Sequence, residues 1–322
     1  MRPFPKQRMP MLGVMLAAAL LAASCTGSDE PLRDSREALG TVVAITAYGP
    51  DEQVIRDSAD AAYAAMDEVE SELDAHDPDS AIGLVNATAE PALEPLPPRA
   101  EVVLDTICVL GVREWFSPQL WAAAEAWAFE EGGRVPTDEQ LAVALADLRY
   151  DFGGAAKGIG LDEAATALRA DGVVAAGLIS SGSTTLAFGE KPDGEPWRIG
   201  IEDPRDTQAV VATVEATGDI TVSTSGDYQR YFERDGVRYH HILDPATGLP
   251  ARGLRSLTVI GDISGLYSDI LSTALFVAGP DAAVAYAEEY GLGLVLVDEE
   301  GRTRVVPGPE GASWSIVAAG GD

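Results

Sequence analysis

The residues with the clearest potential for chemistry are the eight at positions 151–158, which read DFGGAAKG. This glycine-rich turn runs into a helical pattern, and its Lys157 is one of only two lysines after residue 6. Backbone N–H groups at a helix start and the positive end of the helix dipole attract phosphate. The GxxxxGK[ST] spacing of a P-loop is absent. We therefore expect a phosphorylated ligand near Lys157, bound without a Walker A loop.

A carboxylate and a hydroxyl form the second candidate site. Asp269 and Thr273 are four residues apart in the helical pattern of residues 264–278, so both point from one face of that helix. Their oxygens are hard ligands that suit magnesium. The spacing also permits a structural role, in which Asp269 complements the helix dipole and Thr273 packs beside it.

Two adjacent histidines form the third candidate. His240 and His241 lie in a predicted strand, so only one of them can face a site. An imidazole with a pKa of roughly 6.5 suits general base catalysis near neutrality. The alternative is a surface histidine beside the hairpin turn DPATG at residues 244–248. The hydroxyl-rich stretch at residues 221–227 is likewise either a ligand-binding segment or an ordinary strand end.

Charge limits the classes of partner. The 322 residues include 52 acidic and 22 basic side chains, giving a net charge of −30. This balance excludes binding to nucleic acid and electrostatic attachment to anionic lipid. A protein this negative needs local positive charge to hold a phosphorylated ligand, and a divalent metal ion is the obvious source. Hydrophobic residues make up 46% of the chain, enough for a sizeable core.

The N-terminus is typical of a targeting segment. Basic residues precede an apolar run of 13 residues at positions 11–23, which is too short to span a bilayer. The sequence LAASC then ends at Cys25 and resembles a lipobox, which predicts lipidation of Cys25 and removal of residues 1–24 as a lipoprotein signal peptide. The alternative is a soluble secreted protein cleaved nearby. Cys108 is then left in the apolar run 102–112, where we expect a buried thiol.

Residues 25–38 are polar and predict a tether, followed by a single domain over residues 39–322. Helices and strands in this domain are segregated rather than alternating, which favours an α+β fold of antiparallel β-sheets flanked by helices. The helices are expected at residues 51–73, 99–112, 121–129, 264–278 and after the glycine turn up to Gly172. The strands are expected at residues 40–48, 176–188 and 196–201, and in an antiparallel meander at 210–216, 220–224, 228–233, 238–243 and 256–261, with a hairpin turn at Asp235-Gly236.

Several segments, taken in order, resemble the FAD:protein FMN transferase family, also called the ApbE family. The resemblance covers nearly the whole chain after the targeting segment. The segments are LGT at 39–41, PDS at 78–80, DFGGAAKGIGLDEAATAL at 151–168, WRIGIEDP at 197–204, STSGDYQRYF at 223–232, RYHHILDPATG at 238–248 and SDILSTALFV at 268–277.

This resemblance implies a T-fold-like domain, a reaction and a set of site residues. The reaction is magnesium-dependent transfer of the FMN half of FAD to a threonine hydroxyl of an acceptor flavoprotein, with release of AMP. The implied Mg²⁺ ligands are the Ala156 carbonyl, Asp269 and Thr273. His241 matches a histidine of the family pattern and is our candidate general base, with Asp269 as the alternative base. The residues expected at the flavin dinucleotide are Leu39, His76, Phe116, Ser117, Gly153, Lys157, Ile159 and Ile242.

Some positions depart from the family pattern. The family segment GAFDPTV appears as EWFSPQL, which places Ser117 where aspartate is common and Gln119 where threonine is common. Two alternatives to transfer therefore stay open: a non-catalytic, membrane-tethered FAD-binding lipoprotein, and a hydrolase that converts FAD to FMN and AMP. In each case the lipid on Cys25 would hold the protein on the extracytoplasmic face of the cell membrane.

Overall fold

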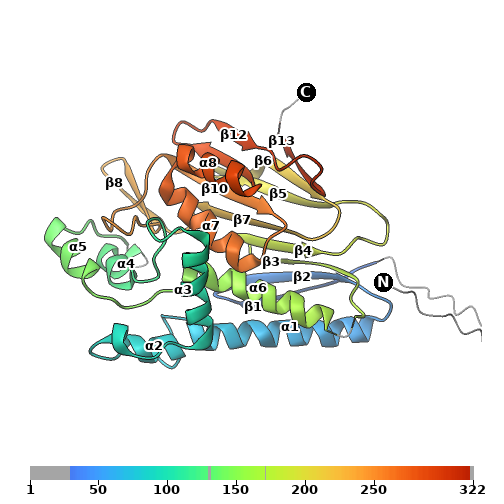
Figure 1. The fold of residues 1–322 in the computed structure, drawn as a ribbon, viewed down its shortest axis with the longest axis horizontal. Helices are drawn as coiled ribbons and strands as arrows, with labels where there is room; N and C mark the ends of the chain where they lie inside the picture. Colours follow the sequence, from blue (N-terminus) through green and yellow to red (C-terminus); the bar gives the residue numbers. More distant parts are fainter. Residues whose placement is uncertain (1–29, 130–131, 171, 320–322) are drawn as a thin grey trace, which may run out of the picture.

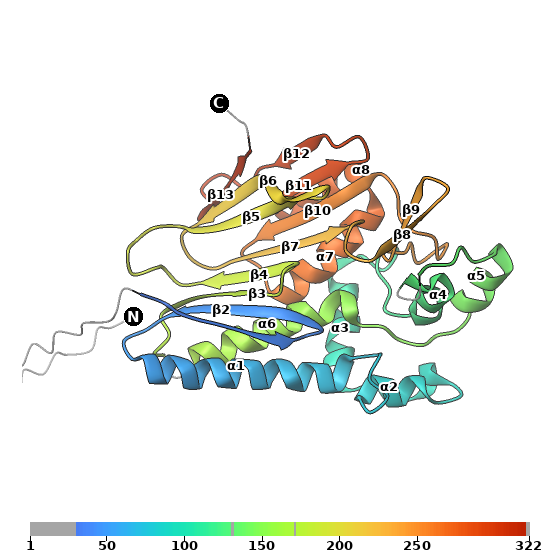
Figure 2. The same ribbon diagram turned by 180° about the vertical axis from the view of Figure 1, so that it is seen from behind.

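The computed structural model of the chain describes residues 30–129, 132–170 and 172–319 (Figures 1 and 2). A large antiparallel sheet forms the middle layer, with helices on one face and a small sheet on the other. This confirms the predicted α+β class. The signal peptide and Cys25 lie outside the described residues.

The large sheet has eight strands in the order β1-β2-β3-β4-β7-β10-β11-β12. They are β1 (Leu32–Ala38), β2 (Thr41–Tyr48), β3 (Ala176–Ser180), β4 (Thr184–Phe188), β7 (Ile220–Gly226), β10 (Leu254–Gly261), β11 (Gly293–Asp298) and β12 (Thr303–Val306). The small sheet has the order β13-β6-β5, and β8 pairs with β9 as a separate hairpin. These strands are β5 (Trp197–Asp203), β6 (Asp206–Ala216), β8 (Tyr231–Arg234), β9 (Val237–His240) and β13 (Trp314–Ala318).

Alternating side chains place one face of the large sheet against the helices and the other against the small sheet. On β10, Leu257 and Val259 join the helix-side core, whereas Ile260 joins the core shared with the small sheet. The helices are α1 (Glu52–Leu73), α2 (Ala81–Asn86), the 3₁₀ turn η1 (Pro91–Leu93), α3 (Pro98–Leu110), α4 (Trp121–Trp127), α5 (Asp138–Leu145), α6 (Gly153–Arg169), α7 (Gly265–Ala278) and α8 (Pro280–Tyr290). Within the described ranges, no helix combines the length and the apolar run that crossing a membrane requires.

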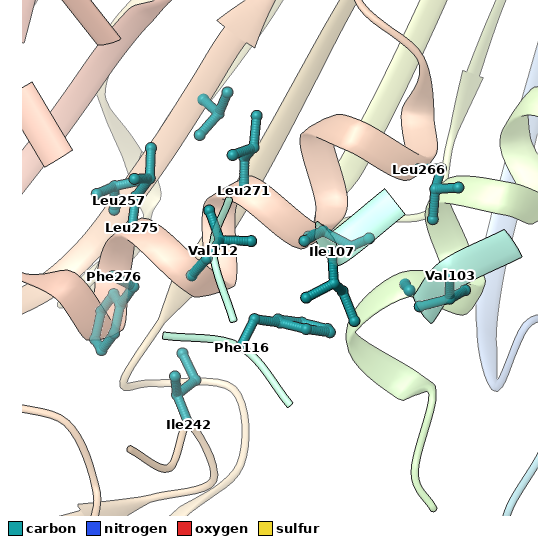
Figure 3. Packing of buried hydrophobic residues seen from close by; sticks show 14 of the residues in the cluster. Val103, Ile107, Val112, Phe116, Ile242, Leu257, Leu266, Leu271, Leu275 and Phe276 are labelled. Carbon is teal, nitrogen blue, oxygen red and sulfur yellow. The ribbon is translucent and has the colours of Figure 1, made fainter. Parts of the chain in front are cut away.

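Helix α7 is the centre of the helix-side core (Figure 3). Its Leu266 lies toward Val103 of α3, and its Leu275 lies beside Leu257 of β10. Ser264 caps the start of α7 by accepting a hydrogen bond from the Tyr267 amide at 3.2 Å. Because α7 is buried on several sides, the positions of its polar residues Asp269 and Thr273 are fixed by packing.

A small lobe projects at one end of the molecule, where α4, α5 and the β8–β9 hairpin gather (Figure 2). Its core is aromatic: the Trp127 ring lies 5.3 Å from Tyr239 and 6.4 Å from Phe232, measured between centroids. The Trp127 indole N–H donates to the Gly248 carbonyl at 2.8 Å. These contacts fix the lobe to the loop that follows β9.

The predicted hairpin turn at Asp235-Gly236 is confirmed. Both residues have positive φ, 53° and 76°, as a type I′ turn between β8 and β9 requires. Helix α5 was not predicted, although Thr137 and Gln140 form a capping box in front of it. That pairing was the sequence signal for α5.

Three predictions of strand organisation are wrong. The expected strand at 176–188 is two strands, β3 and β4, because the Ser181 amide bonds to the Thr184 carbonyl at 2.9 Å and Gly182 has a φ of 83°. The expected meander is divided, since β6 joins the small sheet and β7 pairs with β4 and β10. The tether prediction fails for residues 32–38, which form edge strand β1 paired with β2.

The predicted buried thiol is also wrong. Cys108 is exposed near the end of α3, where its sulfur lies beside the Arg113 guanidinium. The run 102–112 is amphipathic: Val103 and Ile107 face the core, whereas Val102 and Val109 face outward. A continuous apolar run therefore did not mean burial on every side.

Candidate functional site

The glycine-rich segment forms the beginning of α6. Helix α6 starts at Gly153, so Lys157 lies in its second turn rather than at its start. The Asp151 carboxylate accepts the Gly153 amide at 2.7 Å, and the Lys157 ammonium donates to the Gly153 carbonyl at 3.1 Å. The expected free N–H group at Gly153 is therefore occupied by a carboxylate, and Lys157 is the cation that this segment presents to the cavity described below.

Asp269 is a buried carboxylate on α7, with only 5% of its surface exposed. One carboxylate oxygen accepts the Gly158 amide of α6 at 3.0 Å, and the other accepts the Thr184 hydroxyl at 3.3 Å. Burial raises the pKa of Asp269, and the nearby charge of Lys157 opposes that rise. Both donors are neutral, so the negative charge is only partly balanced by the chain.

Hydroxyl groups on strands β4 and β7 form hydrogen bonds that reach Asp269 and Thr273 of α7. Ser223 donates to Thr184 at 3.0 Å, and Thr184 in turn donates to Asp269. Ser225 shares a hydrogen bond of 3.1 Å with Thr273. Ser223 and Ser225 are two residues apart on β7, so their side chains point to the same face of the sheet. The hydroxyl-rich stretch recognised in the sequence therefore bonds, directly or through Thr184, to Asp269 and Thr273 of α7.

Helices α6 and α7 touch backbone to backbone. A Cβ added at Gly158 would lie 2.3 Å from the Gly265 carbonyl oxygen, and one added at Gly265 would lie 2.5 Å from the Gly158 carbonyl oxygen. Real Cβ atoms do not approach oxygen this closely, so a side chain at either position would force the two helices apart. The contact brings Asp269 within hydrogen-bonding reach of the Gly158 amide.

The residues present fit a magnesium ion. Ala156, Asp269 and Thr273 line the same cavity, and they offer a backbone carbonyl, a carboxylate and a hydroxyl. These are the hard oxygen donors that Mg²⁺ prefers, and Mg²⁺ usually keeps waters and binds substrate phosphates as well as one or two carboxylates. The negative charge of Asp269 is only partly balanced by neighbouring groups, and a bound cation would neutralise it, which is a second reason for the fit.

The two histidines have opposite environments. His240 is 2% exposed; its Nε2 donates to the Ala251 carbonyl at 2.9 Å and its Nδ1 accepts the Ile242 amide at 3.3 Å. Both ring nitrogens are thus used in the core, and burial lowers the pKa of His240 to about 4. The predicted strand over residues 238–243 is too long, because β9 ends at His240 and His241 is the first residue after it. Of the two histidines, His241 lines the cavity.

The contacts of His241 define its tautomer. Its Nδ1 lies 3.3 Å from the Arg230 carbonyl, and since a carbonyl only accepts, Nδ1 carries the proton. The unprotonated nitrogen is then Nε2. Enclosure by the protein, and to a lesser extent the charge of Arg230, hold the pKa of His241 well below its usual value. His241 is therefore a neutral imidazole with one ring nitrogen able to accept a proton.

The cavity has a volume of about 1040 Å³ and lies between α6, α7 and the small lobe. This is at the upper end of the range for ligand sites, roughly 300–1,000 Å³. Aromatic side chains line part of it, among them Trp115, Phe116, Trp121 and Phe129. His76 and Trp121 contact each other with ring centroids 4.6 Å apart. A cavity lined both by flat apolar rings and by Lys157 with carboxylate and hydroxyl oxygens suits a ligand with ring systems joined by phosphates.

Two glycines allow side chains to approach α6 closely. A Cβ at Gly154 would lie 2.9 Å from the Phe116 ring, and one at Gly160 would lie 2.5 Å from the Leu39 side chain. Leu39 itself has a φ of 54°, a strained conformation for leucine, in the two-residue turn between β1 and β2. The strained turn directs the Leu39 side chain toward α6, and Leu39 lines the cavity.

The structure brings most of the predicted site residues together around this cavity. Its lining includes Leu39, His76, Phe116, Ser117, Gly153, Ala156, Lys157, His241, Ile242, Asp269 and Thr273. The exception among the described residues is Ile159, which is buried in the core behind the cavity wall because it follows the inward face of α6. Cys25 lies outside the described residues.

Sequence reasoning missed two supporting groups. Thr184 is the first residue of β4, and its hydroxyl donates to Asp269. It reaches Asp269 because β3 and β4 form a hairpin, where a single continuous strand was predicted. Asp162 accepts the amides of Gly265 and Leu266 at 2.6 and 3.0 Å, at the start of α7. No spacing in the sequence links Asp162 to residues a hundred positions later.

Comparison with known proteins places these features in a family. Residues 39–296 match the model of the ApbE family. Among curated proteins, the FAD:protein FMN transferase of Vibrio cholerae is 30% identical over 313 residues, covering 88% of this chain and 92% of that protein. The FAD:protein FMN transferase of Treponema pallidum is 29% identical over 345 residues, covering 92% of this chain and 93% of that protein.

Solved structures agree in fold. The ApbE protein of Thermotoga maritima superimposes with a TM-score of 0.74 at 31% sequence identity, covering 85% of this chain and 96% of that one. The flavinyl transferase ApbE of Pseudomonas stutzeri, in its apo form, gives a TM-score of 0.72 at 32% identity, covering 86% and 93%. The match extends over almost all of each relative.

Proposed function

The chain belongs to the ApbE family and is an FAD:protein FMN transferase, and from this premise we propose the details of its reaction. FAD binds in the cavity, its FMN half passes to a threonine hydroxyl of an acceptor flavoprotein, and AMP is released. The observation that carries the proposal is that a buried carboxylate, a hydroxyl, a lysine and a neutral histidine line one cavity large enough for a dinucleotide.

The transfer is a substitution at phosphorus. The threonine oxygen forms a bond to the phosphorus on the FMN side, and the bond from that phosphorus to the bridging oxygen breaks. AMP leaves with the bridging oxygen, and the threonine proton passes to Nε2 of His241. Phosphoryl transfer of this kind depends on positioning and charge stabilisation more than on covalent help from the protein.

Ala156, Asp269 and Thr273 would hold Mg²⁺, which when bound supplies positive charge to the pyrophosphate. Lys157 adds a fixed positive charge from α6. The hydrogen bonds from Gly158 and Thr184 hold the Asp269 carboxylate in one orientation. Asp269 is the weaker candidate for the base because both of its oxygens are already engaged.

One assay separates this proposal from its alternatives. Purified protein is incubated with FAD, Mg²⁺ and an acceptor domain that carries an exposed threonine, and the products are separated under denaturing conditions. Fluorescent acceptor together with an equal amount of AMP supports transfer to threonine. Free FMN without labelled acceptor indicates a hydrolase, and intact FAD that stays with the protein indicates a storage role.

Two variants complete the assay. A threonine-to-valine acceptor should stay unlabelled, since valine keeps the shape and lacks the hydroxyl. The Asp269→Ala variant should lose Mg²⁺-dependent transfer, while Asp281→Ala, which removes an exposed carboxylate at the start of α8, should keep it. Wild-type transfer by Asp269→Ala, or transfer that survives a chelator, would refute the metal assignment.

We also propose that lipid on Cys25 anchors the protein to the extracytoplasmic face of the membrane. Support comes from the basic, apolar and LAASC segments of the sequence. Strand β1 begins at Leu32, only seven positions later, so a linker of at most roughly 25 Å separates the anchor from the domain. A Cys25→Ser variant should move from the membrane fraction to the soluble fraction; unchanged membrane association would argue against the anchor.

A further inference from the structure

Helices α6 and α7 exchange hydrogen bonds through two carboxylates. Asp162 on α6 accepts the amides of Gly265 and Leu266, the first two residues of α7, at 2.6 and 3.0 Å. Asp269 on α7 accepts the amide of Gly158 on α6 at 3.0 Å. Each helix thus donates backbone amide hydrogen bonds to a carboxylate of the other helix. On its own helix, each carboxylate lies four residues after the glycine that makes the Gly158–Gly265 contact.

The Asp162 contact is directional. A carboxylate that bridges two consecutive amides at a helix start fixes that helix along its axis, and it also meets the positive end of the helix dipole. Asp162 is partly buried, and burial raises its pKa despite the two amide bonds. The chain therefore keeps a partly desolvated carboxylate at the place where α7 meets α6.

We propose that Asp162 is a positioning residue for the metal site, an inference that rests on the proposed function. It holds α7 at the axial position where Asp269 and Thr273 face Ala156 of α6. Glycine at positions 158 and 265 sets how closely the helices approach, but a smooth glycine contact does not prevent sliding. The bonds from Asp162 supply the missing restraint along the helix axis.

The alternative is that Asp162 contributes only to stability. The neighbouring residue gives a matched control, because Glu163 also lies on α6 and its carboxylate also bonds another helix, here through an ion pair. Its carboxylate bonds Arg99 of α3 at 2.7 Å, so it connects α6 to α3 rather than to α7. Loss of either carboxylate should lower stability, whereas only loss of Asp162 should loosen the metal site.

The test measures metal binding directly. Mn²⁺ is titrated into the full-length protein without FAD, and the free ion is followed by electron paramagnetic resonance, with thermal unfolding recorded for each variant. Asp162→Asn keeps the shape of the side chain but removes one acceptor and the charge. We expect its Mn²⁺ dissociation constant to rise at least about tenfold, as is typical when a group that orients a metal ligand is removed. Glu163→Gln should stay within about twofold of wild type.

Each outcome has a clear meaning. Binding by Asp162→Asn within twofold of wild type would overturn the proposal, as would equal weakening by Glu163→Gln. If Asp162→Asn does not fold, Asp162→Glu retains both acceptors and the charge but is longer by one methylene group, and unchanged Mn²⁺ affinity in that variant would also overturn it. A wild-type protein that binds no Mn²⁺ refutes the metal site itself, whereas normal wild-type binding with an unaffected Asp162→Asn variant refutes only this role.

Discussion

The contact between α6 and α7 makes Gly158→Ala the most informative single change. The added Cβ would lie 2.3 Å from the Gly265 oxygen, 2.6 Å from its carbonyl carbon and 2.8 Å from the Leu266 Cα. All three are backbone atoms, so no side chain can rotate away. Ordinary contact begins at about 3.4 Å, so α7 must move away from α6 by roughly 1 Å at this point.

The effect on stability should be modest. Overpacking of this kind lowers the free energy of unfolding by about 1–3 kcal/mol, while replacing glycine by alanine in a helix raises it by about 1 kcal/mol. The net loss of roughly 0–2 kcal/mol corresponds to a fall of only a few degrees in Tm for a domain of this size. The site should suffer more, because Asp269 and Thr273 move with α7 while Ala156 stays on α6.

A displacement of about 1 Å at reacting groups can reduce a rate by about 100-fold. We therefore expect FMN transfer by Gly158→Ala to fall by roughly two orders of magnitude while the protein remains folded. The assay is labelling of the acceptor at saturating FAD and Mg²⁺, with Tm measured in parallel. Gly261→Ala is the control, because the atoms nearest its Cβ would belong to the side chains of Leu292 and Ile263 rather than to backbone, and Gly261 is not among the residues that line the cavity. Near-wild-type transfer by Gly158→Ala would refute the claim that this contact sets the site.

Three further predictions follow from the same geometry. His241→Ala should retain FAD binding but transfer slowly, and loss of FAD binding with unchanged turnover at saturation would remove His241 as the base. Because the lowered pKa keeps His241 neutral, protonation of this residue should not reduce kcat/KM between pH 8 and 6.5; an acid limb centred near 6.5 that disappears in His241→Gln would contradict this. His240 has a pKa of about 4 in the folded state against roughly 6.5 unfolded, so the unfolded chain binds more protons between these values and stability falls on acidification. His240 should lower the free energy of unfolding by about 2 kcal/mol at pH 5 relative to pH 8, measured by urea unfolding. His240→Gln should reduce this dependence of stability on pH.

The limits of sequence reasoning are clear at the histidines and the hydroxyl groups. Alternation along the predicted strand led us to expect that His240 and His241 would differ, but β9 ends at His240, and the pattern gave no sign of which histidine enters the core. That choice depends on the Ala251 carbonyl and on Phe276, whose ring meets His240 edge-on at 5.5 Å. Likewise, the hydroxyl-rich stretch at 221–227 could be recognised, but its bond to Thr273 comes from a helix nearly fifty residues later.

Local patterns fix local features, and these were readable from the amino acids alone. The helical spacing of Asp269 and Thr273 and the Asp235-Gly236 turn depend on neighbours within a few positions. The motifs, each local and taken in order, identified the family, and the segregation of helices and strands identified the α+β class. Periodicity marks which face of an element is buried, but not which element covers it. Tertiary packing alone decided that polar residues 32–38 form an edge strand, that Cys108 faces solvent, and that Gly158 meets Gly265. These contacts join residues whose partners are chosen by the fit of whole surfaces, and no short stretch of sequence carries that information.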